Sequence, residues 1–100
     1  MIDKSSYDHR GITGAQIRAA RALIRWTAAD LASNADLGVA TIRRAETADG
    51  LPQMTLSNLA AVRRTLEGAG IKFIFEEDGA LGVCLRKTQF AARAQRDSSR

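Results

Sequence analysis

The chain has one cysteine, one proline, one histidine and few aromatic residues among its 100 residues. The single thiol, Cys84, excludes an internal disulfide and any zinc site that needs two or more thiolates. Because His9 is the only histidine, we expect no metal site and no cofactor. No apolar run approaches the roughly 20 residues that cross a bilayer, and the first residues lack the pattern of a signal peptide. We therefore expect a cytoplasmic protein that does not enter membranes.

The length and composition predict one small globular domain. Hydrophobic residues make up 45% and charged residues 26% of the chain, which is typical of a soluble domain. The 15 Lys and Arg residues exceed the 11 Asp and Glu residues, and 12 of these 15 cations are arginine. Because a guanidinium group can pair with a phosphate or a guanine edge through two hydrogen bonds, the composition favours a polyanionic partner. No nucleophile is paired with a base and no phosphate-binding loop is present, so we expect no enzyme.

Helix-start signals divide the chain into its parts. An apolar residue, a cap residue and a second apolar residue four positions after the cap recur four times. These starts predict a mainly α fold with helices near 14–24, 28–35, 39–48 and 56–67. The helical domain spans 12–67, and we expect a flexible arm at 1–11 and a flexible basic tail at 88–100, where apolar periodicity is absent.

Residues 68–87 are predicted to form a β-hairpin. The runs 71–76 and 81–86 are rich in β-branched and aromatic residues. Asp78 and Gly79 between them are a strong turn signal, and we expect a three-residue loop at 78–80.

This loop sets the register of the hairpin, most of whose apolar residues lie on one face. It would place Phe75 opposite Val83 and Phe73 opposite Leu85. A two-stranded hairpin is marginal alone, so its apolar face is expected to cover the fourth helix in part. The free strand edge can pair with the same strand of a second chain, which predicts a homodimer. The residues expected in this dimer interface are Ile71, Phe73, Phe75, Val83 and Leu85.

The second and third predicted helices are separated by only about three residues. So short a link forces two helices to cross sharply, as in a helix-turn-helix motif. The residues expected to face inward are Leu31, Ala32, Ala35, Leu37, Ile42 and Ala45. The residues that the third helix turns outward are Val39, Ala40, Arg43, Arg44 and Thr47. This outward face is the candidate DNA-reading surface.

Four stretches of the sequence resemble the lambda-repressor-like, Xre-type helix-turn-helix regulators, over roughly residues 12–75. They are Ile17-Arg18-x-x-Arg21, Trp26-Thr27-x-x-Asp30-Leu31-Ala32, Ala40-Thr41-Ile42-Arg43-Arg44-x-Glu46 and Gly50-Leu51-Pro52. The resemblance implies a four-helix domain, here followed by a C-terminal β-hairpin. It also implies that Arg21 pairs with Glu46 and ties the first helix to the recognition helix. The resemblance implies DNA contacts from the start of the second helix and from the recognition helix, to which we add Thr41 and Thr47. The predicted DNA-binding residues are Thr27, Ala28, Gly38, Val39, Ala40, Thr41, Arg43, Arg44 and Thr47.

The sequence departs from the pattern of that family in three places. Ala28 stands where a DNA-contacting glutamine is usual, and Asp36 stands where the turn usually has glycine. Gly38 and Val39 replace a typical polar pair at the start of the recognition helix. These residues do not predict the operator sequence.

We expect a sequence-specific transcription regulator, mainly a repressor, located in the cytoplasm and associated with the nucleoid. It would bind a palindromic operator in double-stranded DNA as a homodimer, with helix 39–48 in the major groove. The alternative is a protein-binding module, of antitoxin or antiactivator type, with DNA binding secondary or lost. Salt dependence separates the two, because binding through several phosphates weakens steeply as salt rises.

Overall fold

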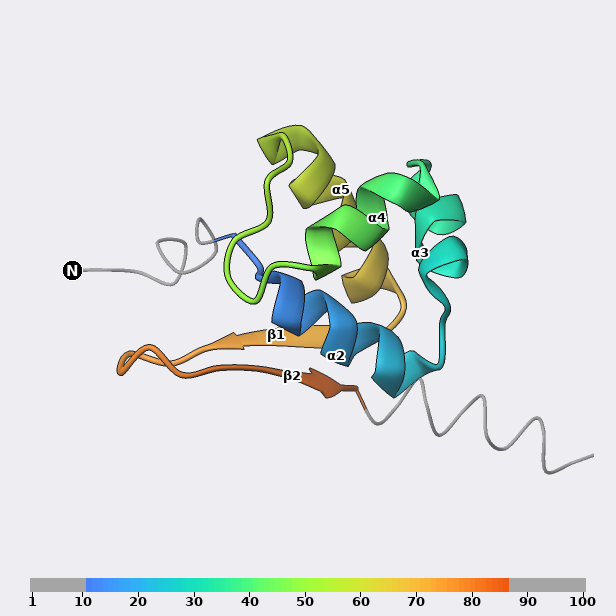
Figure 1. The fold of residues 1–100 in the computed structure, drawn as a ribbon. Helices are drawn as coiled ribbons and strands as arrows, with labels where there is room; N and C mark the ends of the chain where they lie inside the picture. Colours follow the sequence, from blue (N-terminus) through green and yellow to red (C-terminus); the bar gives the residue numbers. More distant parts are fainter. Residues whose placement is uncertain (1–10, 87–100) are drawn as a thin grey trace, which may run out of the picture.

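The computed structural model describes residues 11–86, which form four helices followed by a two-stranded antiparallel hairpin (Figure 1). The elements are α2 (Gly14–Ile24), α3 (Ala28–Ala35), α4 (Val39–Glu46), α5 (Leu56–Gly68), β1 (Ile71–Phe75) and β2 (Leu81–Leu85). The predicted fold class is therefore confirmed. Apart from Gly11, the expected arm at 1–11 and the expected tail at 88–100 lie outside the described residues. None of the described helices is long and apolar enough to cross a membrane.

The helix starts follow the cap signals of the sequence. Thr13 and Thr27 both form capping boxes, in which each threonine and the residue three positions later satisfy one another's backbone N–H groups. The side chain of Thr55 accepts a hydrogen bond from the N–H of Asn58, while Gly38 gives α4 no side-chain cap. The positions of α2 and α3 match the predicted ranges, because local hydrogen bonds determine both starts.

Helix α4 ends two residues earlier than the predicted 39–48. The N–H of Thr47 turns back to the carbonyl of Arg44, at 3.3 Å, in place of a bond four residues back. The hydroxyl of Thr47 donates to the same carbonyl at 2.7 Å. This local bonding tightens the last turn and stops the helix.

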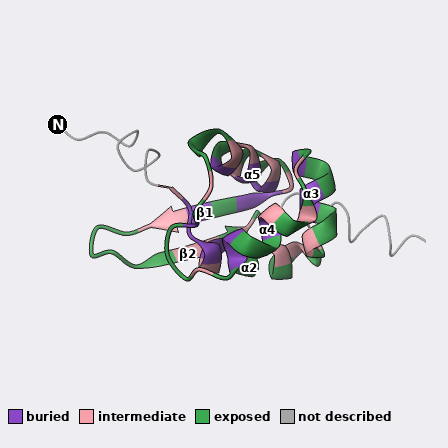
Figure 2. Cartoon of the chain, turned by 45° about the horizontal axis from the view of Figure 1, so that its top comes forward, coloured by how far each residue is buried: buried purple, intermediate pink, exposed green. Residues whose placement is uncertain are grey.

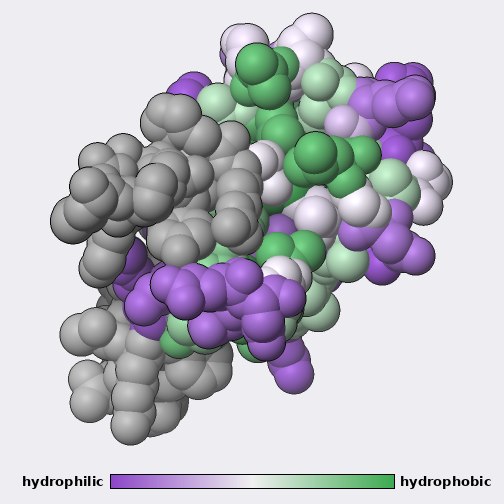
Figure 3. Space-filling model, turned by 90° about the vertical axis from the view of Figure 1, so that its left-hand side faces the viewer, coloured by the Kyte–Doolittle hydropathy of each residue, from purple (hydrophilic) through white to green (hydrophobic). Residues whose placement is uncertain are grey.

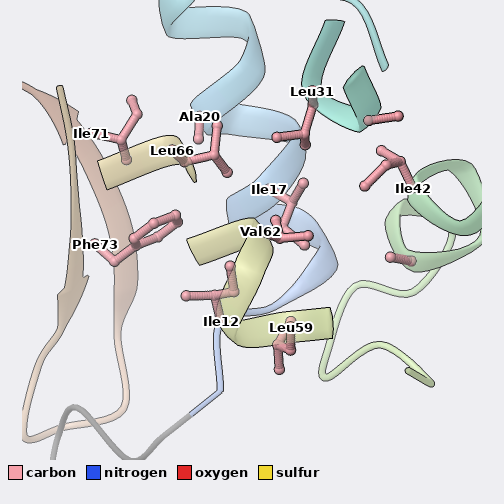
Figure 4. Close-up of a cluster of buried hydrophobic side chains, with 12 residues drawn as sticks. Ile12, Ile17, Ala20, Leu31, Ile42, Leu59, Val62, Leu66, Ile71 and Phe73 are labelled. Carbon is pink, nitrogen blue, oxygen red and sulfur yellow. The ribbon is translucent and has the colours of Figure 1, made fainter. Parts of the chain in front are cut away.

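The core lies between the four helices and the inner face of the hairpin (Figure 4). It takes buried side chains from the segment before α2, from every helix and from β1, whereas β2 contributes half-buried ones. Burial of each large aliphatic side chain contributes about 1.5–3 kcal/mol. The twelve buried residues are Ile12, Ile17, Ala20, Leu31, Ala32, Ile42, Ala45, Leu59, Val62, Leu66, Ile71 and Phe73.

Two residues expected in the dimer interface belong to this core instead. Ile71 and Phe73 extend from β1 toward Leu66 of α5 and are buried within their own chain (Figure 4). They offer no surface to a second chain. The other three expected residues, Phe75, Val83 and Leu85, are half-buried at the margin of the core (Figure 2).

The predicted register of the hairpin was wrong. Phe73 lies opposite Val83, and the neighbouring pairs are Ile71 with Leu85 and Phe75 with Leu81. The N–H of Glu76 donates to the carbonyl of Ala80 at 2.8 Å, so the loop is 77–79 and not 78–80. Gly79 has a φ of 94°, and in three-residue hairpin loops the left-handed residue stands last. The correction moves each partner by two residues, so the apolar face of the hairpin stays the same.

One buried amide joins the start of α2 to the hairpin. The side-chain Oε1 of Gln16 accepts a hydrogen bond from the N–H of Thr13, at 3.0 Å, within the capping box. Its Nε2 donates to the carbonyls of Gly82, at 3.0 Å, and Ile74, at 3.3 Å. The sequence predicted the capping role of Gln16 but not its contact with the hairpin. An amide can serve both roles because it has an oxygen that accepts and an NH₂ group that donates.

We therefore expect Gln16→Glu to destabilise the fold by about 1–3 kcal/mol, because the carboxylate keeps the cap but cannot donate to the two strand carbonyls. The change is measured as the free energy of unfolding in urea. As a control, Asp30→Ala removes the equivalent residue of the exposed capping box on α3 and should cost only about 1 kcal/mol. A stability of Gln16→Glu equal to that of the wild type would show that the contact of Gln16 with the hairpin adds nothing.

Candidate nucleic-acid interface

Helices α3 and α4 are joined by a three-residue turn of defined geometry. The turn residues are Asp36, Leu37 and Gly38, and Asp36 adopts the left-handed conformation with a φ of 61°. The N–H of Leu37 donates to the carbonyl of Ala32, at 2.9 Å, and the N–H of Asp36 donates to that of Ser33, at 3.3 Å. These two bonds form a Schellman motif, which closes the end of α3 and directs the chain into α4.

The inner side of this two-helix unit is packed into the core. Five of the six residues expected to face inward are buried, and Leu37 is half-buried against the same cluster. Among the predicted DNA-binding residues, the exposed ones are Thr27, Gly38, Ala40, Arg43, Arg44 and Thr47 (Figure 2). The half-buried ones are Ala28, Val39 and Thr41. Because Ala28 and Val39 pack against the core, only part of each side chain can reach a ligand.

The outward face of α4 carries positive charge without a nearby counter-ion. Arg43 and Arg44 are both exposed, and within residues 11–86 neither guanidinium forms an ion pair or a side-chain hydrogen bond. The only acidic residue of α4 is Glu46, which points inward. Sequence reasoning missed Arg25, an exposed arginine two positions before Thr27, whose left-handed φ of 61° places it at the turn between α2 and α3.

A partly buried ion pair holds α4 against α2. Nε and Nη2 of Arg21 donate to the two carboxylate oxygens of Glu46, at 2.6 and 2.7 Å, and Nη1 donates to the carbonyl of Trp26 at 2.8 Å. The Glu46 side chain is only 9% exposed. Its hydrogen bonds raise the pKa of Arg21 above the ordinary value, against the opposing effect of burial. The raised pKa keeps the Arg21 guanidinium positively charged at physiological pH.

The end of α4 is fixed by two further contacts from α2. Arg18 donates from Nη1 to the carbonyl of Glu46, at 2.6 Å, and from Nη2 to the carboxylate of Asp49, at 2.8 Å. A guanidinium at the C-terminus of a helix is also favoured by the helix dipole. A methyl group at Gly14 would overlap the carbonyl oxygen of Ala48, so glycine is required for this close approach of the two backbones.

No protein-family model matches the chain, and no curated protein matches its sequence. Residues 11–86 contain no group of three or more His, Cys, Asp or Glu side chains that could hold a metal ion. The exposed side chains of the α3–α4 surface include the guanidinium groups of Arg43 and Arg44, the carboxylates of Asp30 and Asp36 and the methyl group of Ala40.

We expect Arg21→Ala and Glu46→Ala each to destabilise the fold by about 2–3 kcal/mol, because each leaves a charge with no partner in a partly buried place. The double variant should lose less than the sum of the two. Urea unfolding measures all three. Asp49→Ala, which breaks the exposed pair of Arg18 and Asp49, should cost no more than about 0.5 kcal/mol. Additive losses would refute a direct coupling of Arg21 with Glu46.

Asp36→Gly should stabilise the fold by about 0.5–1 kcal/mol, since glycine adopts the left-handed conformation without the steric cost that a side chain incurs. Thermal unfolding followed by circular dichroism measures the change. Ser33→Gly, three residues earlier within α3, is the matched control and should destabilise by a similar amount. A loss of stability in Asp36→Gly would show that the aspartate side chain contributes more to the turn than its backbone strain costs.

Proposed function

We propose that this chain is a sequence-specific DNA-binding transcription regulator that reads the major groove with α4. The observation that carries the proposal is the charge distribution on that helix. Arg43 and Arg44 point outward without partners among the described residues, while the only acid of the helix is bound to Arg21. An exposed helix with two unpaired guanidinium groups, held rigidly at its other face, suits a groove lined by phosphates and base edges.

The individual residues suggest how the contacts are divided. Arg43 and Arg44 can donate two hydrogen bonds each to O6 and N7 of guanine, and the exposed methyl group of Ala40 can contact a thymine methyl group. Thr27 and Arg25 lie at the start of α3, where backbone N–H groups favour a phosphate. The carboxylate of Asp30 accepts from the N–H of Thr27 at 2.9 Å and lowers the positive potential there. We infer that the arginines supply most of the electrostatic attraction.

Binding as a homodimer would double these contacts. Two copies related by a two-fold axis would present two α4 helices to half-sites about 34 Å apart, so the operator should be palindromic. Occupation of a promoter by such a dimer would repress it.

A second candidate is the protein-binding module of antitoxin or antiactivator type. The observation that favours it is the exposure of two leucines beside the α4–α5 loop, Leu51 at 64% and Leu56 at 84%. Leucines this exposed suit contact with another protein.

Selection from a library of random DNA duplexes tests the proposal. The purified chain should enrich a two-fold symmetric sequence, and its affinity for that sequence should fall steeply as salt rises. Enrichment of no sequence, together with binding that unrelated competitor DNA abolishes, would contradict the proposal and favour the protein-binding alternative.

On the selected duplex, Arg44→Ala should lower affinity by about 1–3 kcal/mol without loss of folding, because it removes a bidentate contact with a base. Fluorescence anisotropy at fixed salt measures the change. Arg64→Ala is the matched control, since Arg64 is equally exposed but lies on α5, and it should leave the affinity unchanged. If the two substitutions have equal effects, Arg44 contributes only general charge.

A further inference from the structure

Within residues 11–86, no hydrogen bond uses the backbone groups at the outer edge of β2. The bonds from Glu76 to Ala80 and from Arg86 to Gly70 show that the even-numbered residues form the hydrogen-bonded pairs between the two strands. In an antiparallel ladder the alternate residues therefore direct their N–H and C=O groups away from the partner strand. On β2 these are Leu81, Val83 and Leu85, and β2 forms the lower edge of the molecule in Figure 1.

Nothing in the sequence of β2 protects this edge. Its five residues include no charge and no proline, which are the usual means by which exposed edge strands avoid pairing. Leu81 is 46% exposed on the face that otherwise covers the core. Strand β1 differs, because it carries the charged residue Lys72. In addition, the guanidinium of Arg63 from α5 lies 5.8 Å from the ring centre of Phe73 and 5.5 Å from that of Phe75.

The side chains of β2 are nearly symmetric about its middle residue. Leu81 and Leu85 lie at equal distances on either side of Val83, and the small residues Gly82 and Cys84 lie between them. Antiparallel pairing of two copies about Val83 places Leu81 opposite the partner's Leu85. The exposed leucine then gains an apolar neighbour, and the inner faces of two hairpins join in one layer.

The same register brings opposite charges together. Beyond Leu81, this pairing places Ala80 opposite the partner's Arg86. The partner's Arg86 would then lie next to the hairpin tip, where Glu76, Glu77 and Asp78 are all exposed. Figure 3 views the molecule from the end at which the hairpin loop lies, and the lower part of this view is hydrophilic. A shift of the pairing by two residues in either direction would lose the opposition of Leu81 to the partner's Leu85.

We propose that the chain dimerises through β2, pairing antiparallel with β2 of a second copy about Val83 to form a four-stranded sheet. The proposal rests on the proposed function only in that such a dimer would bind the palindromic operator. The two-fold axis is perpendicular to this sheet, so the helices of both copies lie on the same side of it.

Disulfide cross-linking reports the register directly. About Val83, residue 82 lies opposite the partner's residue 84 in a non-hydrogen-bonded pair, where Cα atoms are about 4.5 Å apart and within reach of a disulfide. The two native Cys84 residues would be offset from one another by two residues along the strands, which with the spacing between strands puts their Cα atoms beyond the roughly 7 Å limit. The site tolerates a side chain, because a Cβ on Gly82 would meet only Ile74 at 3.8 Å.

Under mild oxidation, Gly82→Cys should therefore form a covalent dimer with two interchain disulfides, seen by intact mass and non-reducing electrophoresis. The wild-type chain, with Cys84 alone, should not cross-link. The control Gly82→Cys combined with Cys84→Ser should not cross-link either. Covalent dimers of the wild type or of this control would overturn the register about Val83. Failure of Gly82→Cys to cross-link in a chain that sediments as a monomer would overturn the dimer itself.

A second pair of variants tests the edge without cysteine chemistry. Leu81→Lys places a charge beside the partner's Leu85 and should raise the dimer dissociation constant at least roughly tenfold in sedimentation equilibrium. Leu23→Lys on α2, where the leucine is 41% exposed, is the matched control and should leave dimerisation unchanged. Equal effects of both variants would refute the role of the β2 edge.

The two proposals fail in different ways. A dimer that cross-links as expected but selects no DNA leaves the β2 interface standing and removes the regulator. A monomer that selects a single half-site removes the β2 interface and leaves DNA recognition standing.

Discussion

The ion pair of Arg21 with Glu46 is the interaction on which the arrangement of the helices depends. It fixes α4 against α2 through two short hydrogen bonds, and Arg18 takes the last carbonyl of the same helix. At its other end, α2 holds the hairpin through Gln16. Helix α2 thus contacts both the candidate reading helix α4 and the sheet. It does so through three polar side chains, those of Gln16, Arg18 and Arg21, while its apolar side chains pack into the core. Helix α4, which has no side-chain cap of its own, is held by these contacts with α2 together with the turn from α3.

The pair also determines the charge that α4 presents outward. An eight-residue helix with two arginines and one glutamate would have little net field if the glutamate lay among the arginines. Because Glu46 is turned inward and paired with Arg21, the only charged groups on the outer face of α4 are the guanidinium groups of Arg43 and Arg44. A single contact therefore serves packing and electrostatics together. This is why the surface proposed to bind DNA follows from the core of the protein rather than from the overall charge alone.

Sequence reasoning succeeded where the determining interactions are local and failed where they are not. Thr13 and Thr27 start their helices through bonds three residues long, so α2 and α3 were predicted at their observed positions. The hairpin register depended on which loop residue takes the left-handed conformation, and Gly79 takes the last place, not the middle one. The second role of Gln16 and the close approach at Gly14 join residues more than thirty positions apart, and no local pattern signals either one. Arg25 was missed because only its exposure next to α3 marks it.

In the proposed dimer, the hairpin would place the α4 helices of both copies on one sheet. A two-stranded sheet is marginal on its own, and here Gln16 and the core hold its inner face. No hydrogen bond among the described residues uses the backbone groups at the outer edge of β2. Since antiparallel pairing of identical strands places the two-fold axis perpendicular to the sheet, the helices of both copies would stand on one common side. Each α4 is tied to this sheet through α2, so the spacing of the two reading helices would be set by rigid elements and not by a linker. Such a dimer would therefore favour one half-site spacing, because packed elements would fix the positions of both α4 helices.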